Sequence, residues 1–179
     1  MALFTYGLPK MVIKQNEWYP GRFATAWGVN LSSVGIPKAG VTVEYGQIVT
    51  LEKVTNGTAD YVLDKVASGD TVFGVVVRTV DGGISMTDTA ISAPRAGQPV
   101  SVIPLGAPNF YEIAVPVESG EVPVAGSPAY VSYVASSEGA VREDVDTNKG
   151  IALTGWIYAG AKYSPTKGAG ECVIIRKTA

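Results

Sequence analysis

The densest group of potentially reactive side chains is the acidic stretch that contains Glu143, Asp144 and Asp146. Two carboxylates at a suitable separation can hydrolyse a glycosidic bond. Oxygen ligands at alternate positions, such as Asp144, Asp146 and Asn148, can wrap Ca²⁺. The match to an EF-hand loop fails twice, because Lys149 stands where that loop requires glycine and a glycine stands where it requires a bidentate glutamate. The sequence favours a solvated hairpin loop here and leaves open whether Ca²⁺ binds.

The rest of the chain lacks the side chains on which most enzyme sites depend. Histidine is absent, which removes Ser–His and Cys–His pairs, the commonest general base and most zinc sites. No P-loop, nucleophile elbow or dinucleotide-binding glycine motif is present. Cys172 is the single cysteine, and its apolar neighbours predict a buried, inert thiol. We therefore predict that the protein is not an enzyme, with no catalytic or cofactor-binding residues and no assigned metal ligand.

The composition favours contacts with other proteins. Of the 179 residues, 46% are hydrophobic and 17% are charged, against a usual charged share of about 25%. Apolar surface on such a protein is often covered by a partner or by copies of itself. Without a Lys/Arg run, and with a net charge of -2, the chain offers no face for nucleic acid. No signal peptide is visible, and the longest nearly apolar stretch, 151–161, is too short to span a bilayer, so we expect synthesis in a cytoplasm and no membrane partner.

Short strands must carry these residues. Valine is the commonest residue, and 21 glycines and 11 prolines interrupt the chain, which is typical of an all-β protein. Glycine-containing turns are predicted at 81–83 and 137–139, and 87–96 is the one candidate for a short helix. Alternating or continuous apolar residues predict strands at 41–45, 47–54, 71–80, 100–105, 109–117, 129–135, 151–159 and 172–177.

Two weak internal repeats refine this prediction. Segments 46–51, 97–102 and 126–131 each begin with a turn glycine followed by a strand. Segments 72–76 and 153–157 each carry a glycine inside a strand, which usually marks a bulge or a tight bend. We therefore predict an all-β fold, a small bent β-barrel or β-sandwich with an extended N-terminal arm.

Residues 1–40 differ from the rest, because aromatic residues and prolines alternate there with neither the strand nor the helix period. This pattern predicts an extended arm, 1–40, that lies on another surface, followed by a barrel or sandwich domain, 41–179. The alternative is a segment folded against its own core. Aromatic side chains bury large apolar areas when they dock. The candidate protein-binding residues are Phe4, Tyr6, Trp18, Tyr19 and Trp27.

These features together resemble those of the decoration proteins of tailed-bacteriophage capsids, also called structural cement proteins. The likeness rests on the start, 1–37, on the segments that begin at Gly46, Gly97 and Gly126, and on the strand 151–157. It implies a non-catalytic virion protein on the capsid surface that binds the assembled head from outside and bridges major capsid protein subunits. It also implies self-association, with a homotrimer favoured over a homodimer.

Three other classes remain open. One is another β-rich virion part, such as a tail, baseplate or head-fibre subunit. Another is an enzyme with a carboxylate site at Glu143 and Asp144. The third is a carbohydrate-binding module with an aromatic stacking face, although core and interface packing explains the same rings more simply. The rings in question belong to Tyr130, Tyr133, Trp156, Tyr158 and Tyr163.

Overall fold

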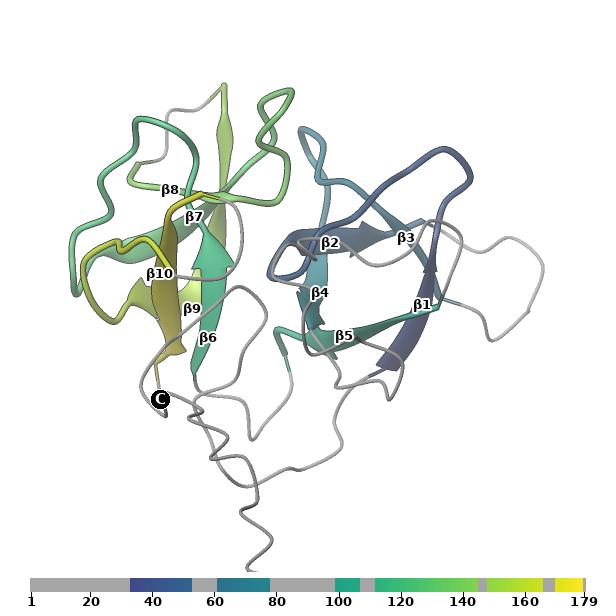
Figure 1. Ribbon diagram of the computed structural model, residues 1–179, viewed down its shortest axis with the longest axis horizontal. Coiled ribbons are helices and arrows are strands. Elements are labelled where there is room, and N and C mark those ends of the chain that lie inside the picture. Colours follow the sequence, from purple (N-terminus) through teal and green to yellow (C-terminus); the bar gives the residue numbers. More distant parts are fainter. Residues whose placement is uncertain are drawn as a thin grey trace, which may run out of the picture.

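The computed structural model describes residues 33–52, 61–77, 99–106, 112–144, 148–165 and 170–178, which form ten β-strands and no helix. Figure 1 shows two lobes side by side. The first lobe contains β1 (Ser33–Pro37), β2 (Ile48–Leu51), β3 (Tyr61–Asp64), β4 (Val72–Val77) and β5 (Val100–Pro104). The second contains β6 (Glu112–Pro116), β7 (Pro128–Ser132), β8 (Val141–Arg142), β9 (Gly150–Tyr158) and β10 (Cys172–Lys177). The all-β prediction is confirmed.

The sheet of the first lobe closes on itself in the order β1-β3-β2-β4-β5, because β1 runs parallel to β3 and antiparallel to β5. A register shift in β2 between Val49 and Thr50 bends the sheet where it pairs with β4. Gly74 in β4 permits a close approach to β5, since a Cβ atom at this position would lie 2.4 Å from the carbonyl oxygen of Ile103. This small, strongly bent sheet is one of the two forms that the strand glycines predicted.

The second lobe has a five-stranded sheet in the order β6-β10-β9-β7-β8. Its two edges meet at one parallel bridge between Val117 and Val141. There the Glu118 N–H donates a hydrogen bond of 2.8 Å to the Val141 carbonyl. A register shift in β7 between Pro128 and Tyr130 bends this sheet against β9.

The two lobes repeat one topology strand for strand. In each lobe the first strand lies parallel to the third, by a ladder in the first lobe and by the single bridge in the second, and the other neighbours are antiparallel. The turn before the second strand also recurs: the Gln47 N–H donates to the Glu44 carbonyl, and the Ser127 N–H to the Val124 carbonyl. The repeat between 46–51 and 126–131 therefore falls on the equivalent strands β2 and β7. Gly97 of the third copy lies outside the described residues.

The second repeat is real, but it is shifted by one residue. The Val76 N–H donates to the Gln47 carbonyl as the Tyr158 N–H donates to the Ser127 carbonyl, so Val76 and Tyr158 are equivalent. Phe73 thus corresponds to Gly155, and the predicted pairing of the two strand glycines is wrong by one position. The two glycines have different roles. Gly155 has a positive φ, of 79°, whereas Gly74 permits a close approach to β5.

A shared hydrophobic core joins the lobes. One buried cluster contains Ile48, Val75 and Ile103 of the first lobe together with Ile113 and Ile175 of the second. The two sheets therefore pack against each other as in a sandwich, while a smaller cluster fills the interior of the first lobe. Two hydrogen bonds complete the junction: the Ile48 N–H donates to the Gly139 carbonyl at 2.9 Å, and Gln47 Nε2 donates to the Glu138 carbonyl at 2.6 Å.

Segment 41–45, predicted as a strand, belongs instead to the loop between β1 and β2. Side chains of this loop alternate between buried and exposed positions, since Val43 points inward and Thr42 and Glu44 point to solvent. Strands β1, β3 and β8 were missed. The predicted turn at 81–83, the helix at 87–96 and arm residues 1–32 lie outside the described residues, whereas 33–40 form β1 and the turn after it. Among the described residues no helix could cross a membrane.

Candidate functional site

All five residues predicted as protein-binding anchors fall outside the described part of the chain. The arm as a binding segment therefore stays a prediction. These residues are Phe4, Tyr6, Trp18, Tyr19 and Trp27. The sites that can be built from contacts lie on the two lobes.

The acidic stretch that follows β8 supports a neighbouring loop. The Glu143 carboxylate accepts a hydrogen bond of 3.0 Å from the Val122 N–H, and the Glu143 N–H donates to the Glu121 carboxylate at 3.0 Å. Asp144 Oδ1 lies 3.4 Å from an Arg142 guanidinium nitrogen, and Asp146 lies outside the described residues. No group of three potential metal ligands occurs in the described segments. In the described residues Glu143 and Asp144 therefore act as structural acceptors.

Arg142 contacts several residues around the end of β8. Its side chain is only 4% exposed, and its guanidinium lies 3.4 Å from Glu118 and 3.2 Å from Glu121. The hydroxyl of Tyr158 donates to the Arg142 carbonyl oxygen and accepts a hydrogen bond of 3.1 Å from the Tyr130 N–H. Burial raises the pKa of Tyr158 to about 12, so the hydroxyl stays protonated and keeps donating at neutral pH. The cluster fixes the loop between β6 and β7 to the body of the second lobe.

The aromatic residues proposed as a carbohydrate platform do not form one. Trp156 and Tyr158 are buried in the shared core, and Tyr133 packs against it. Tyr130 and Tyr163 are half-buried. Stacking on a sugar requires an open ring face, and burial leaves Trp156 only 4% exposed and Tyr158 fully covered. Packing, the simpler explanation, accounts for them.

Cys172 is buried, as predicted, and burial raises the pKa of its thiol to about 12. We expect the native protein to leave a thiol reagent unreacted at neutral pH, while the same protein in concentrated guanidinium chloride reacts fully, because only the unfolded chain exposes the thiol and lets it ionise. Mass spectrometry of the labelled protein measures this. Rapid labelling of the native protein would contradict the buried, inert assignment.

Exposed hydrophobic side chains mark two candidate contact surfaces. On the first lobe, Val34, Ile36 and Tyr61 are exposed, and the Tyr61 ring stacks on Phe73 with 5.6 Å between centroids. On the second lobe, two valines of the loop between β6 and β7 are exposed. Sequence reasoning missed both surfaces, although Val34-Gly35-Ile36 and Val122-Pro123-Val124 each show the alternation that places two apolar residues on one side.

Two hollows of the described surface are open to solvent. One, of about 580 Å³, is lined by Asp64, Lys65, Asp70 and Glu138 among others. Lys65 lies 3.6 Å from Glu138, so its charge links the two lobes. Another, of about 450 Å³, is lined by residues of both lobes, including Trp156. Neither holds a nucleophile paired with a histidine, since the sequence has none.

Comparison with known proteins gives two findings that fit this geometry. A family model described as structural cement protein (E217 gp24/Pam3 gp6) matches residues 10–178, nearly the whole chain. A chain in the solved structure titled "The capsid of Myoviridae Phage XM1" has a similar fold, with a TM-score of 0.61, 15% sequence identity, and coverage of 99% of this chain and 98% of that one. A comparison with curated proteins found no match.

Proposed function

The chain belongs to the phage structural cement protein family, and on that premise we propose that it binds the outside of the assembled head and bridges neighbouring major capsid protein subunits. As a cement protein it is a component of the virion capsid with a structural role. We propose that it acts through its surfaces alone, without catalysis.

The match to the family model carries this proposal, because it spans both lobes and extends into the arm as far as residue 10. Two features of the described residues support it. The shared core and the hydrogen bonds of Ile48 and Gln47 make the lobes one rigid body, so contacts on different lobes keep a fixed distance. Apolar side chains are exposed on both lobes, which is what a bridging protein requires.

The physical mechanism is mass action. A protein that binds the mature shell better than the immature one shifts the equilibrium toward the mature lattice. A standard interface buries about 1,600 Å² in total. When many copies bind one shell, their modest contacts sum, and the shell resists internal pressure better. Heads that lack the protein should therefore lose DNA at a lower temperature than heads that carry it.

The arm is the proposed shell contact, with its aromatic residues as anchors. Replacing Trp18 and Trp27 together by alanine is expected to weaken binding to heads by about tenfold or more, since each change removes a large apolar contact. Sedimentation of purified heads with increasing amounts of the protein measures the affinity.

The matched control keeps the aromatic character by replacing both tryptophans with phenylalanine, which should retain most of the affinity. Undiminished binding by the alanine variant, or by a chain that lacks residues 1–20, would refute the arm as the contact. Far-UV circular dichroism verifies that all variants fold.

Self-association is proposed as well, with a homotrimer favoured and a homodimer as the alternative. The low charged share, 17%, leaves apolar surface for such contacts. Size-exclusion chromatography with light scattering distinguishes the two states from a monomer.

A further inference from the structure

The loops that precede β2 and β7 have the same backbone but different outward residues. In the first lobe the Val41 N–H donates to the Lys38 carbonyl, and in the second lobe the Glu121 N–H donates to the Glu118 carbonyl at the same place in the turn. The inward residue is buried in both loops, Val43 in one and Pro123 in the other. The loops therefore form two versions of one scaffold.

The outward positions differ in polarity. The first lobe places Thr42 and Glu44 there, and the second lobe places Val122 and Val124, which are 53% and 61% exposed. Since the first loop folds with polar residues at these positions, the fold does not require the valines. A single exposed valine needs no explanation, but a pair that replaces polar equivalents on one rigid loop indicates contact with a partner.

Ionic contacts hold the valine loop in place. The Glu143 carboxylate accepts the hydrogen bond of the Val122 N–H, and Lys162 Nζ donates to the Glu121 carbonyl at 3.1 Å while it pairs with Glu171 at 2.7 Å. The buried guanidinium of Arg142 forms an ion pair with the Glu121 side chain. A loop ordered before binding loses little conformational entropy when a partner docks.

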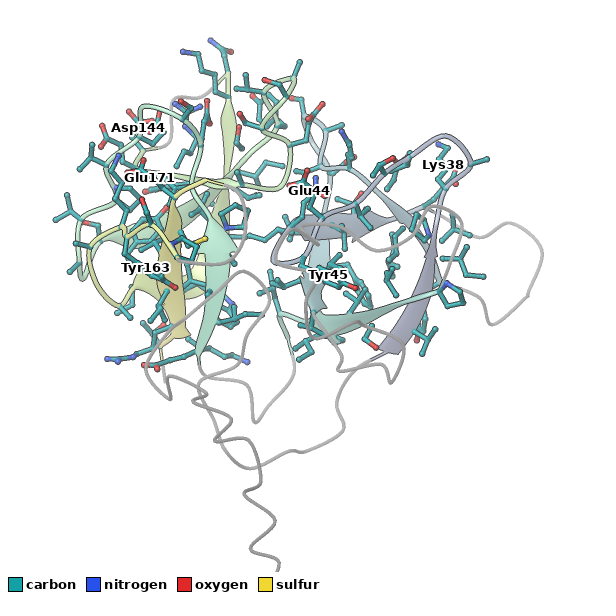
Figure 2. The ribbon with its side chains drawn as sticks, in the orientation of Figure 1. Lys38, Glu44, Tyr45, Asp144, Tyr163 and Glu171 are labelled. Atoms are coloured by element: carbon teal, nitrogen blue, oxygen red, sulfur yellow. The ribbon has the colours of Figure 1, made fainter. Side chains whose placement is uncertain are left out.

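The charge around the valines selects the kind of partner. In the contacts recorded for the described residues of the loop and its supports, the carboxylates outnumber the cations, which are Arg142 and Lys162. In the view of Figure 2, Asp144 and Glu171 are both on the side of the second lobe that faces away from the first. The carboxylates belong to Glu118, Glu121, Glu143, Asp144 and Glu171. Joining two copies through this face would bring like charges together, which opposes a second copy as the occupant.

We infer that Val122 and Val124 insert into an apolar groove with a basic rim on a shell subunit, which makes this loop a second shell contact in addition to the arm. The inference rests on the proposed function, because it names the partner chemistry of one capsid-facing surface. The acidic surroundings would steer the loop toward the basic rim, and burial of the valines would supply affinity.

The test exchanges the outward residues between the two loops. The variant Val122→Thr/Val124→Glu gives the second loop the residues of the first, and Thr42→Val/Glu44→Val makes the reverse change as the matched control. The probe is purified heads assembled without this protein, in a sedimentation assay. We expect about a tenfold or greater loss of affinity for the first variant and no more than about a twofold change for the control. Both variants should keep the wild-type melting temperature, because the exchanged side chains are exposed.

The outcomes separate this inference from the proposed function. If wild-type protein fails to bind heads, the proposed function fails. If wild-type protein binds and Val122→Thr/Val124→Glu binds equally well, the loop contact alone is overturned. Light scattering adds a further arm, because an oligomer that dissociates on the Val122→Thr/Val124→Glu change would assign the loop to a second copy and overturn the shell assignment. Wild-type affinity that falls as salt is raised supports the basic rim, and salt-independent affinity contradicts it.

Discussion

Replacing Gly139 by alanine is expected to lower the free energy of unfolding by about 2–5 kcal/mol. Gly139 has a φ of 82°, where an L side chain is strained by about 1–2 kcal/mol. A Cβ atom there would also lie 2.2 Å from the Ile48 carbonyl oxygen and 2.6 Å from Gln47 Cγ. This contact is the junction between the lobes, so it cannot relax without separating β2 from the loop that contains Gly139. Urea denaturation followed by tryptophan fluorescence measures the change.

Gly69 is the matched control for this substitution. Its φ is 83°, and a Cβ atom at this position would meet nothing within 4 Å. Gly69→Ala should therefore cost only the backbone strain, about 1–2 kcal/mol. The excess for Gly139→Ala isolates the steric clash at the junction. Equal costs for the two variants would show that the lobes separate freely there, and would remove the rigid body on which a fixed spacing of contacts depends.

The strands that could be predicted are those whose own residues are apolar enough to be buried. The bounds of β10, 172–177, were predicted correctly, because a continuous apolar run places Cys172, Val173 and Ile175 in the core. Strand β9, with nine residues, differs from its prediction by one position at each end. Length and β-branched composition are local properties, so the local sequence was sufficient to predict both β9 and β10.

The strands that were missed depend on distant residues. In β1, Gly35 lies against Leu63 of β3, where a Cβ atom would come within 2.7 Å of the leucine side chain. A strand with a central glycine and a terminal proline has little strand propensity of its own. Strand β8 has two residues, and one of them, Arg142, is buried only because carboxylates from another loop surround it. Neither fact can be read from neighbouring residues.

For the contact surfaces, too, local sequence features could be predicted, and features that depend on distant residues could not. The composition predicted that apolar surface would be shared with other proteins, and the alternation at 41–45 was interpreted as a strand, although this segment is a loop. The alternation did not show that 121–125 repeats this loop, because Pro123 in place of Val43 and valines in place of Thr42 and Glu44 hide the likeness. The repeat becomes visible through backbone hydrogen bonds, which are independent of side-chain identity.

Replacing Arg142 by methionine is expected to lower the free energy of unfolding by about 3–5 kcal/mol. The change keeps most of the apolar stem and removes the charge, so Glu118 and Glu121, with side chains only 13% and 17% exposed, would repel each other without a counter-ion. Removing one partner from a buried ion pair costs more than the pair contributes when intact, because the remaining charges stay desolvated. Urea denaturation of the purified variant measures the loss.

Arg176→Met is the matched control, since Arg176 pairs with Glu112 in an exposed position and should cost less than about 1 kcal/mol. A second variant locates the cause: adding Glu121→Gln to Arg142→Met removes one of the uncompensated charges and should restore part of the stability. If Arg142→Met costs no more than Arg176→Met, the buried cluster does not hold the loop of Val122 and Val124. That loop would then order only on binding, and its affinity for a shell subunit would carry the full entropic cost of ordering.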